Sequence, residues 1–201
     1  MNKIFSIIFV SIIVLGSGCG SQATIKKLND SSVVVSFGDS ITSGTGAPRT
    51  ESYPAVLSDL IQCKVVNAGV PGEDTTAGLR RLPGVLKKYN PDLVILCHGG
   101  NDMLSKQKKD ITISNLDSMV SMVKSFGADV VLVGVPKPAL LLKTHPLYKE
   151  TAGKHRIPLV FDALAEVLSN PALKSDRVHP NGKGYRVIAE SIAVLIRERQ
   201  K

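Results

Sequence analysis

The sequence predicts a three-layer α/β/α fold built on a five-stranded parallel sheet. Two features of the sequence lead to this prediction. Five short apolar runs recur along the chain, and stretches with apolar residues at helical spacing separate them. Strands that alternate with helices are typical of right-handed crossovers, which give a parallel sheet covered by helices on both faces.

The predicted strands are short and apolar, as buried strands of a parallel sheet are. The first runs from Val33 to a turn of small residues, where Gly38 and Gly44 permit tight backbone turns. The other four are the segments Val65–Val66, Leu93–Leu96, Val130–Val133 and Ile157–Val160.

Six helices are predicted around these strands. The C-terminal one places Val187, Ile188, Ile192, Leu195 and Ile196 on one stripe. We expect Pro83 and Gly84 to bend the second helix. The other five are Tyr53–Leu60, Thr75–Tyr89, Ile111–Phe126, Leu147–Lys154 and Ala163–Leu168.

The N-terminal segment predicts export from the cytoplasm. Residues 1–18 combine Lys3, an apolar run and then small residues before Cys19, which is typical of a signal peptide. The apolar run is shorter than the ~20 residues that span a bilayer. Residues 15–19 resemble a bacterial lipobox, although the leucine lies one position farther from the cysteine than usual. We expect Cys19 to be lipidated and to anchor the protein to a membrane of the bacterial cell envelope, on the periplasmic side. Cleavage after Ala23 is the competing interpretation.

The 201-residue sequence supports one domain. We expect residues 19–32 to form a polar tether and residues 33–201 to form the folded domain, as a monomer. The net charge is +8, but the cations are scattered and only 4% of the residues are aromatic. Nucleic-acid binding is therefore not indicated. The positive charge indicates a solvated surface that tolerates anionic lipid headgroups or a polyanionic envelope. Cys63 and Cys97 are expected to be free thiols, and no metal-ligand cluster is present in the sequence.

Four loops carry polar residues that an acyl-transfer site requires. Ser40 follows the first strand, at the sheet edge where open α/β folds bind ligands. Alone, it fits a nucleophile or a helix cap equally well. Gly72 and Asn101 follow the second and third strands and can offer a backbone N–H and a side-chain amide, although each also fits an ordinary loop or Asx turn. Asp176 and His179 are three residues apart, so the carboxylate can orient the imidazole.

These blocks, in this order, resemble the SGNH hydrolases, also called the GDSL esterase and lipase family. The resemblance covers residues 33–199 and is strongest to the thioesterase I, protease I and lysophospholipase L1 branch with its arylesterases. It implies the flavodoxin-like strand order 2-1-3-4-5 and no cofactor or metal. It also implies that Ser40 is the nucleophile, His179 the general base and Asp176 its orienting partner. The oxyanion hole would comprise the Ser40 and Gly72 backbone N–H groups and the Asn101 side chain.

The expected activity is hydrolysis of carboxylic esters through an acyl-enzyme on Ser40. Short or medium acyl, aryl, thio- and lysophospholipid esters are the expected substrates. Met103, Leu104, Pro138 and Leu140 are candidates for an acyl-binding wall, although the last two can equally pack beneath a loop. A carbohydrate acetyl esterase and a noncatalytic ligand-binding lipoprotein are the alternatives.

The other titratable candidates receive structural roles. Asp39 adjoins Ser40, but adjacent side chains diverge, so we expect it to brace the turn. His98 ends an apolar strand and is expected to pack there. His145 and His155 lack a suitably spaced carboxylate in the sequence and are expected on the surface.

Overall fold

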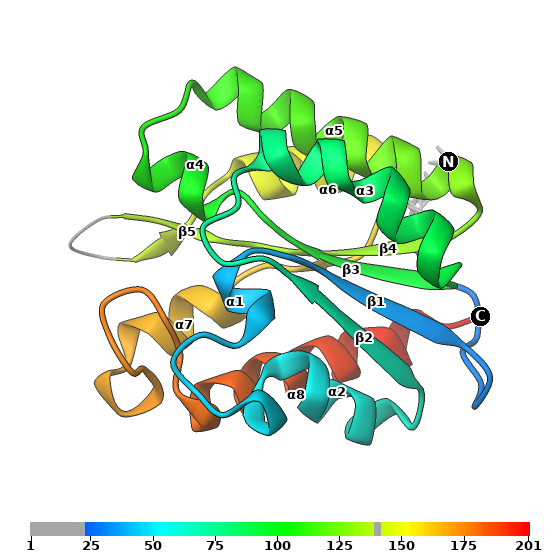
Figure 1. Ribbon diagram of the computed structural model, residues 1–201, viewed down its shortest axis with the longest axis horizontal. Coiled ribbons are helices and arrows are strands. Elements are labelled where there is room, and N and C mark those ends of the chain that lie inside the picture. The colour runs from blue at the N-terminus through cyan, green and yellow to red at the C-terminus, as the bar shows by residue number, and fades with distance from the viewer. Residues whose placement is uncertain (1–22, 139–141) are drawn as a thin grey trace, which may run out of the picture.

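The sheet of this protein is parallel and five-stranded, as the sequence predicts. The computed structural model describes residues 23–138 and 142–201. Its strands are arranged in the order β2-β1-β3-β4-β7, which is the expected 2-1-3-4-5 (Figure 1). They are β1 (Val33–Gly38), β2 (Lys64–Gly69), β3 (Leu93–Cys97), β4 (Asp129–Val133) and β7 (Leu159–Val160).

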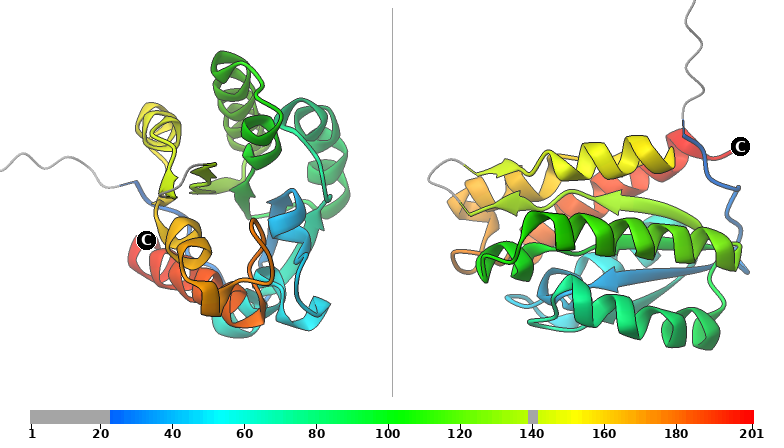
Figure 2. Two further views of the ribbon diagram at one scale, coloured as in Figure 1. Left: turned by 90° about the vertical axis from the view of Figure 1, so that its left-hand side faces the viewer. Right: turned by 90° about the horizontal axis from the view of Figure 1, so that it is seen from above.

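Helices cover both faces of the sheet (Figures 1 and 2). One face carries α3 (Thr75–Tyr89), α5 (Lys109–Phe126) and α6 (Leu147–His155). The other face carries α2 (Tyr53–Ile61), α7 (Ala163–Ser169) and α8 (Gly182–Arg199). Each begins and ends at or close to the residues that the sequence predicts. The three-layer α/β/α fold is therefore confirmed.

Local sequence explains where the longer helices begin and end. The Asp74 carboxylate accepts a hydrogen bond from the Ala77 N–H at 2.7 Å and so caps α3. Asn181 caps α8 in the same way, through the Gly184 N–H. Gly127 ends α5 with a φ of 100°, a left-handed conformation that glycine adopts without strain. Pro83 lies inside α3, which continues to Tyr89 as one helix.

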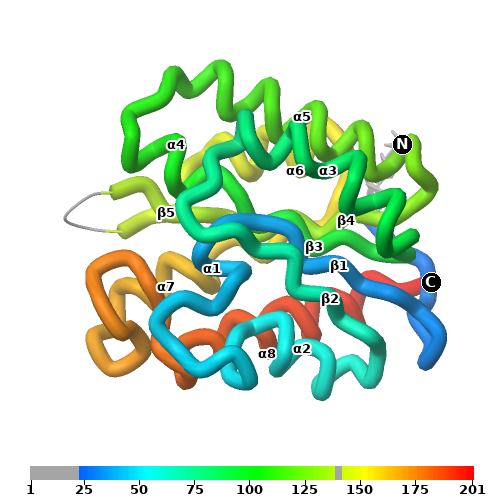
Figure 3. Tube along the Cα trace, in the orientation of Figure 1, coloured from blue at the N-terminus to red at the C-terminus, as the bar shows by residue number. Residues whose placement is uncertain are grey.

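The chain packs against the domain earlier than the expected boundary at Val33. Ile25 is only 3% exposed and belongs to the hydrophobic core. It forms a parallel bridge with Gln200, and its N–H donates to the Arg199 carbonyl at 2.9 Å. The described chain thus starts beside its own C-terminus (Figure 3). The expectation that all of residues 19–32 form a tether is therefore wrong. It could not be corrected from the sequence, because a single bridge at Ile25 leaves no periodic pattern.

We predict that Ile25→Ala lowers the free energy of unfolding by about 2–4 kcal/mol, since it empties a buried aliphatic site. Lys27→Ala, two residues away and exposed, should change it by less than about 0.5 kcal/mol. Urea denaturation of both variants makes the comparison. Equal, small effects would show that this segment does not contribute to the packed domain.

Several short elements had no counterpart in the predictions. They are too short for a periodic pattern to indicate them. They comprise the helices α1 (Ser40–Ser43) and α4 (Gly100–Leu104), the 3-10 turns η1 (Arg49–Glu51) and η2 (Pro171–Leu173), and the hairpin of β5 (Pro136–Lys137) with β6 (Lys143–Thr144).

The described residues bear on the predictions for the two cysteines and for a membrane-spanning segment. Cys63 and Cys97 are both buried free thiols, as expected. Within residues 23–138 and 142–201, none of the helices combines the length and apolar character that crossing a bilayer requires. The predicted signal peptide, the lipidation site Cys19 and the candidate wall residue Leu140 lie outside the described residues.

Candidate active site

Ser40 lies at the carboxyl edge of the sheet, at the first residue of α1. Asp39 is the N-cap of this helix, and its Oδ1 accepts a hydrogen bond from the Ile41 N–H at 3.1 Å. Ser40 is therefore not the helix cap, and Asp39 braces the turn as expected. Gly38 is required just before this turn, because a Cβ atom there would overlap the Cys97 carbonyl oxygen of the neighbouring strand. The turn thus leaves the Ser40 side chain directed into a cavity that this residue lines.

Ser40, His179 and Asp176 form one chain of hydrogen bonds. The Ser40 Oγ lies 3.0 Å from His179 Nε2, and His179 Nδ1 lies 2.8 Å from Asp176 Oδ2. Ser40 comes from the end of β1 and the other two come from the loop before α8. The fold thus brings Ser40 and His179 together although they are 139 positions apart in the sequence. A proton on Nδ1 donates to Asp176 and leaves Nε2 free to accept the serine proton.

The Asp176 carboxylate also shapes the loop that carries His179. Its Oδ1 accepts hydrogen bonds from the backbone N–H groups of Val178 at 2.8 Å and His179 at 2.9 Å. Desolvation raises the pKa of the Asp176 carboxyl, but these hydrogen bonds and the one from the His179 ring outweigh it and hold the pKa below its ordinary range. Asp176 is therefore ionised at any pH where the imidazole accepts a proton.

The three candidate oxyanion donors line the same cavity as the Ser40 side chain. These are the backbone N–H groups of Ser40 and Gly72 and the amide of Asn101. Among the described residues, neither backbone N–H donates a hydrogen bond. Gly72 has a φ of 77°, which favours glycine at this position. The Asn101 Nδ2 donates to the Glu73 carbonyl at 2.9 Å and has a longer contact of 3.3 Å with Asp39 Oδ2.

A buried carboxylate that the sequence analysis missed connects the loops of Gly72 and Asn101. Glu73 Oε2 lies 2.6 Å from Arg81 Nη2 of α3 and 3.2 Å from His98 Nε2, just after β3. Partial burial raises the pKa of the Glu73 carboxyl, but hydrogen bonds and charge interactions with Arg81 and His98 lower it to about 2. The Arg81 guanidinium also stacks 4.3 Å from the centre of the Phe37 ring. Glu73 is thus an ionised, fixed anchor immediately after Gly72.

A second carboxylate makes a similar connection. Asp102 is fully buried, and its Oδ2 accepts a hydrogen bond from the Thr75 N–H at 2.9 Å. Its other oxygen is bonded by the hydroxyl groups of Thr75 and Thr112 and by the Gln107 amide. Glu73 and Asp102 together fix the loops of Gly72 and Asn101 to each other. No local pattern indicates these pairings, because each joins residues from different loops.

The cavity beside Ser40 has a volume of about 920 Å³ and a largely apolar wall. Leu104 and Pro138 line it, as expected. Met103 does not, because its side chain packs against the hydrophobic core. Leu142, from the same run of residues as Pro138, lines it as well. Further apolar lining residues come from α1, from the segment after β4, and from α7, and were not predicted: Ile41, Val135, Leu164 and Leu168. The sequence does not indicate that α7 lines the cavity, because the spacing of its leucines is that of any helix that packs on a core.

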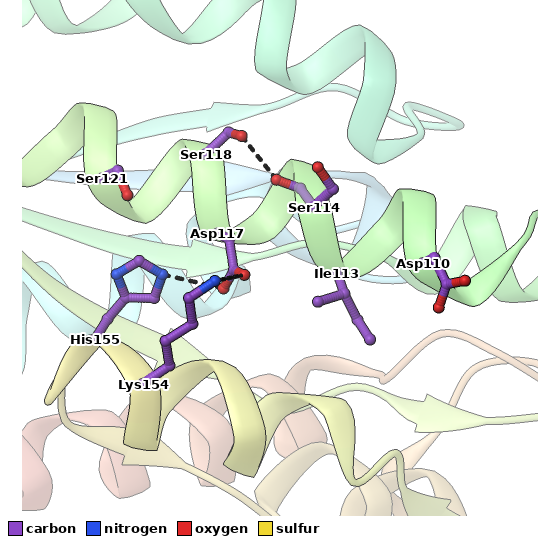
Figure 4. A pocket seen from close by; sticks show the side chains of 8 residues that line it. All are labelled: Asp110, Ile113, Ser114, Asp117, Ser118, Ser121, Lys154 and His155. Atoms are coloured by element: carbon purple, nitrogen blue, oxygen red, sulfur yellow. Dashed lines mark hydrogen bonds and ion pairs between the residues drawn. The ribbon is translucent and has the colours of Figure 1, made fainter.

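The remaining histidines lie away from this cavity. His98 is fully buried after β3, which confirms its packing role, and it additionally pairs with Glu73. His145 is half-buried and accepts a hydrogen bond from the Leu147 N–H at 3.1 Å. His155 has no suitably spaced carboxylate on its own segment, but the fold brings one from α5. Its Nε2 lies 3.0 Å from Asp117 Oδ1, in a shallow groove between α5 and α6 (Figure 4).

The Asp117–His155 pair links the two helices, and within residues 23–138 and 142–201 no serine hydroxyl is hydrogen-bonded to it. Lys154 contacts the same carboxylate at 2.5 Å, and Ser118 donates to the Ser114 carbonyl within its own helix (Figure 4). Among the described residues there is also no group of three or more potential metal ligands. The arrangement around Ser40 is therefore the strongest candidate for chemistry in the described part of the chain.

Fold and site together define a class: an α/β/α hydrolase that acts on ester bonds. The chain belongs to the GDSL-like lipase/acylhydrolase family, whose model matches residues 36–187. The resemblance expected from the four sequence blocks is thereby confirmed.

Relatives of known function agree with this membership. The chain is 31% identical to an arylesterase of Vibrio mimicus over 168 residues, which cover 78% of this chain and 84% of the relative. It is also 31% identical to thioesterase 1/protease 1/lysophospholipase L1 of Escherichia coli K12, with 78% and 79% covered. The crystal structure of TesA superposes with a TM-score of 0.75 at 26% identity, covering 83% of this chain and 98% of TesA.

Proposed function

We propose that this protein is a serine esterase that hydrolyses carboxylic esters through an acyl-enzyme on Ser40. The observation that carries the proposal is the continuous hydrogen-bonded chain from Ser40 Oγ through His179 to Asp176 Oδ2. A serine hydroxyl is a weak nucleophile until a base within hydrogen-bond reach takes its proton. His179 meets that requirement.

In the proposed first step, Ser40 Oγ attacks the ester carbonyl carbon while its proton moves to His179 Nε2. Asp176 stabilises the imidazolium that forms. The negative charge that develops on the carbonyl oxygen is stabilised by the N–H groups of Ser40 and Gly72 and by the Asn101 amide. Collapse of the tetrahedral intermediate breaks the bond to the leaving group, which takes the proton from His179.

In the second step, water replaces the alcohol or thiol. His179 accepts a proton from the water, whose oxygen attacks the acyl carbon, and the same donors stabilise the second tetrahedral intermediate. The bond to Ser40 Oγ then breaks, and the proton returns from His179 to the serine. The products are the free acid and the regenerated enzyme.

Short and medium acyl, aryl, thio- and lysophospholipid esters are the proposed substrates. The apolar wall built by Leu164, Leu168 and neighbouring residues supports an acyl group more extended than acetyl. A series of 4-nitrophenyl esters from acetyl to dodecanoyl tests this choice. A maximum beyond acetyl supports it, whereas a maximum at acetyl, together with release of acetate from acetylated polysaccharide, favours the carbohydrate esterase instead.

Covalent labelling tests the nucleophile. A fluorophosphonate should modify Ser40, as shown by peptide mapping, and should leave Ser40→Ala unmodified. Ser43→Ala, in the same short helix, is the matched control and should be labelled like the wild type. Labelling that persists in Ser40→Ala would place the nucleophile elsewhere.

The activity should fall on the acid side because the base, and not Asp176, becomes protonated. Asp176 has a lowered pKa, so it stays ionised well below neutrality. A protonated His179 cannot accept the Ser40 proton, so we predict that kcat/KM declines on the acid side of neutrality. A kcat/KM that is unchanged down to about pH 4.5 would contradict the assignment of the base.

We also propose that the protein is exported to the cell envelope and anchored through a lipid on Cys19. The support is the sequence of residues 1–19 alone. The mass of the mature N-terminal peptide distinguishes a lipidated Cys19 from cleavage after Ala23.

A further inference from the structure

Two cations from the loop before α8 line the cavity beside Ser40. Lys174 is half-buried, and Arg177, between Asp176 and Val178, is exposed. Lys174 and Arg177 therefore place positive charge at the solvent-exposed rim of the cavity, which is its entrance.

Nearby carboxylates do not neutralise Lys174 or Arg177. Within the described residues, neither cation forms an ion pair. Lys174 Nζ donates to the Leu168 carbonyl at 3.0 Å, which leaves its charge uncompensated. Asp176 is ionised and adjacent to Arg177, but it is paired with His179, and its single charge leaves the two cations in excess.

The one carboxylate that lines the cavity does not offset these cations at the entrance. Asp39 is only 3% exposed and is used to cap α1. Burial raises the pKa of its carboxyl, with the charge of His98 and the Ile41 N–H acting in the opposite direction. The entrance is therefore positive, while the only carboxylate among the described lining residues lies deep in the wall.

Exposed apolar side chains line the same cavity as these cations. Leu104 is 53% exposed and Val178 is 39% exposed, and both line the cavity. A low-dielectric wall next to uncompensated charge strengthens the local field and attracts ligands of opposite sign. This combination suits a molecule with an apolar chain in the cavity and a negative group at its entrance.

We infer that the enzyme prefers esters whose solvent-facing part carries a negative charge, such as a phosphate or a sulfonate, and that Arg177 and Lys174 determine this preference. The inference rests on the proposed esterase function and adds the class of substrate. The acyl chain lies against the leucines of α7, and the anionic group remains near the two cations. Arg177 offers several N–H donors in a planar fork, which suits the oxygens of such a group.

The test compares two esters with the same butanoyl chain. One is the anionic ester of 4-hydroxybenzenesulfonate and the other is the neutral 4-nitrophenyl ester. The measured quantity is the ratio of their kcat/KM values, with each variant compared with wild type, so that the different reactivity of the two leaving groups cancels. Arg177→Gln should lower the ratio about two- to fivefold, and Arg177→Glu should lower it further, because exposed charge pairs contribute modestly.

A control variant has the same change of net charge as Arg177→Glu but at the other end of the molecule. Lys64→Gln/Lys87→Gln replaces two exposed lysines, one at the start of β2 and one in the last turn of α3. It should keep the wild-type ratio. Raising the salt concentration to about 1 M should weaken the wild-type preference, because screening then acts within about 3 Å.

The outcomes separate this inference from the proposed function. Hydrolysis of the neutral ester by wild type, with its loss in Ser40→Ala, supports the esterase function by itself. If the ratio is the same in wild type, Arg177→Gln and Arg177→Glu, or if the control lowers it equally, the inference about anionic substrates is overturned. If neither ester is hydrolysed by wild type, the proposed function fails as well.

Discussion

Ser40→Ala, His179→Ala and the double variant are expected to lower kcat to a similar extent, by about 10⁴- to 10⁶-fold. The two residues act as one unit, because Ser40 is an effective nucleophile only while His179 Nε2, 3.0 Å away, accepts its proton. Removing either group removes the same step, so the second substitution has little left to remove. Steady-state and single-turnover kinetics with a 4-nitrophenyl ester measure the effect.

The double variant shows whether the two substitutions act independently on kcat. Independent roles would make the double variant slower than wild type by the product of the two single-variant factors. Circular dichroism and thermal unfolding of each variant check that the loss does not come from misfolding. Full independence of the two effects would disprove the proposed proton transfer between Ser40 and His179.

Asn101→Ala is expected to lower kcat by about 10²- to 10³-fold with a much smaller change in KM. Its amide would bind the oxygen of the tetrahedral intermediate more strongly than the ester carbonyl, so its loss raises the barrier more than it weakens substrate binding. The amide is well placed for this role, because a 2.9 Å hydrogen bond to the Glu73 carbonyl fixes its orientation.

A transition-state analogue separates this role from a purely structural one. An alkyl boronic acid, which forms a tetrahedral adduct with the serine, should bind more weakly to Asn101→Ala in parallel with the fall in kcat. Asn115→Ala is the matched control, since this amide donates to the hydroxyl groups of Thr75 and Thr76 and does not line the cavity. An analogue affinity equal to that of wild type, despite a lowered kcat, would exclude Asn101 as an oxyanion donor.

Glu73 and Asp102 give the loops of the proposed oxyanion hole a common support. Each carboxylate bonds groups from more than one segment, so the donors are held in place before substrate arrives. Preorganised donors stabilise a developing charge without reorganisation at the moment of reaction. Burying the Glu73 carboxylate costs desolvation free energy, and its ion pair with Arg81 offsets that cost.

The sequence by itself determined the layers, the strands and the residues that come together around Ser40. The spacing of apolar residues is a local property of the sequence, and it differs between a helix and a strand. Each helix and strand can therefore be predicted before any long-range contact is known. Ser40, Gly72, Asn101 and His179 could be identified for a related reason. Each sits just after a predicted strand or just before the last helix, and a parallel sheet brings these positions to one edge.

Only the tertiary structure decided which side chains support the Ser40 site and line its cavity. The pairing of Glu73 with His98, the bridge of Ile25 to Gln200 and the leucines of α7 that line the cavity join segments far apart in the chain. Met103 and Leu104 are neighbours in sequence, yet one packs into the core and the other lines the cavity. Such contacts depend on the relative positions of packed elements, which no local pattern records. The turn that carries Ser40 was therefore predictable from the sequence. The carboxylates that support the neighbouring loops, and the positive charge at the entrance to the cavity, were not.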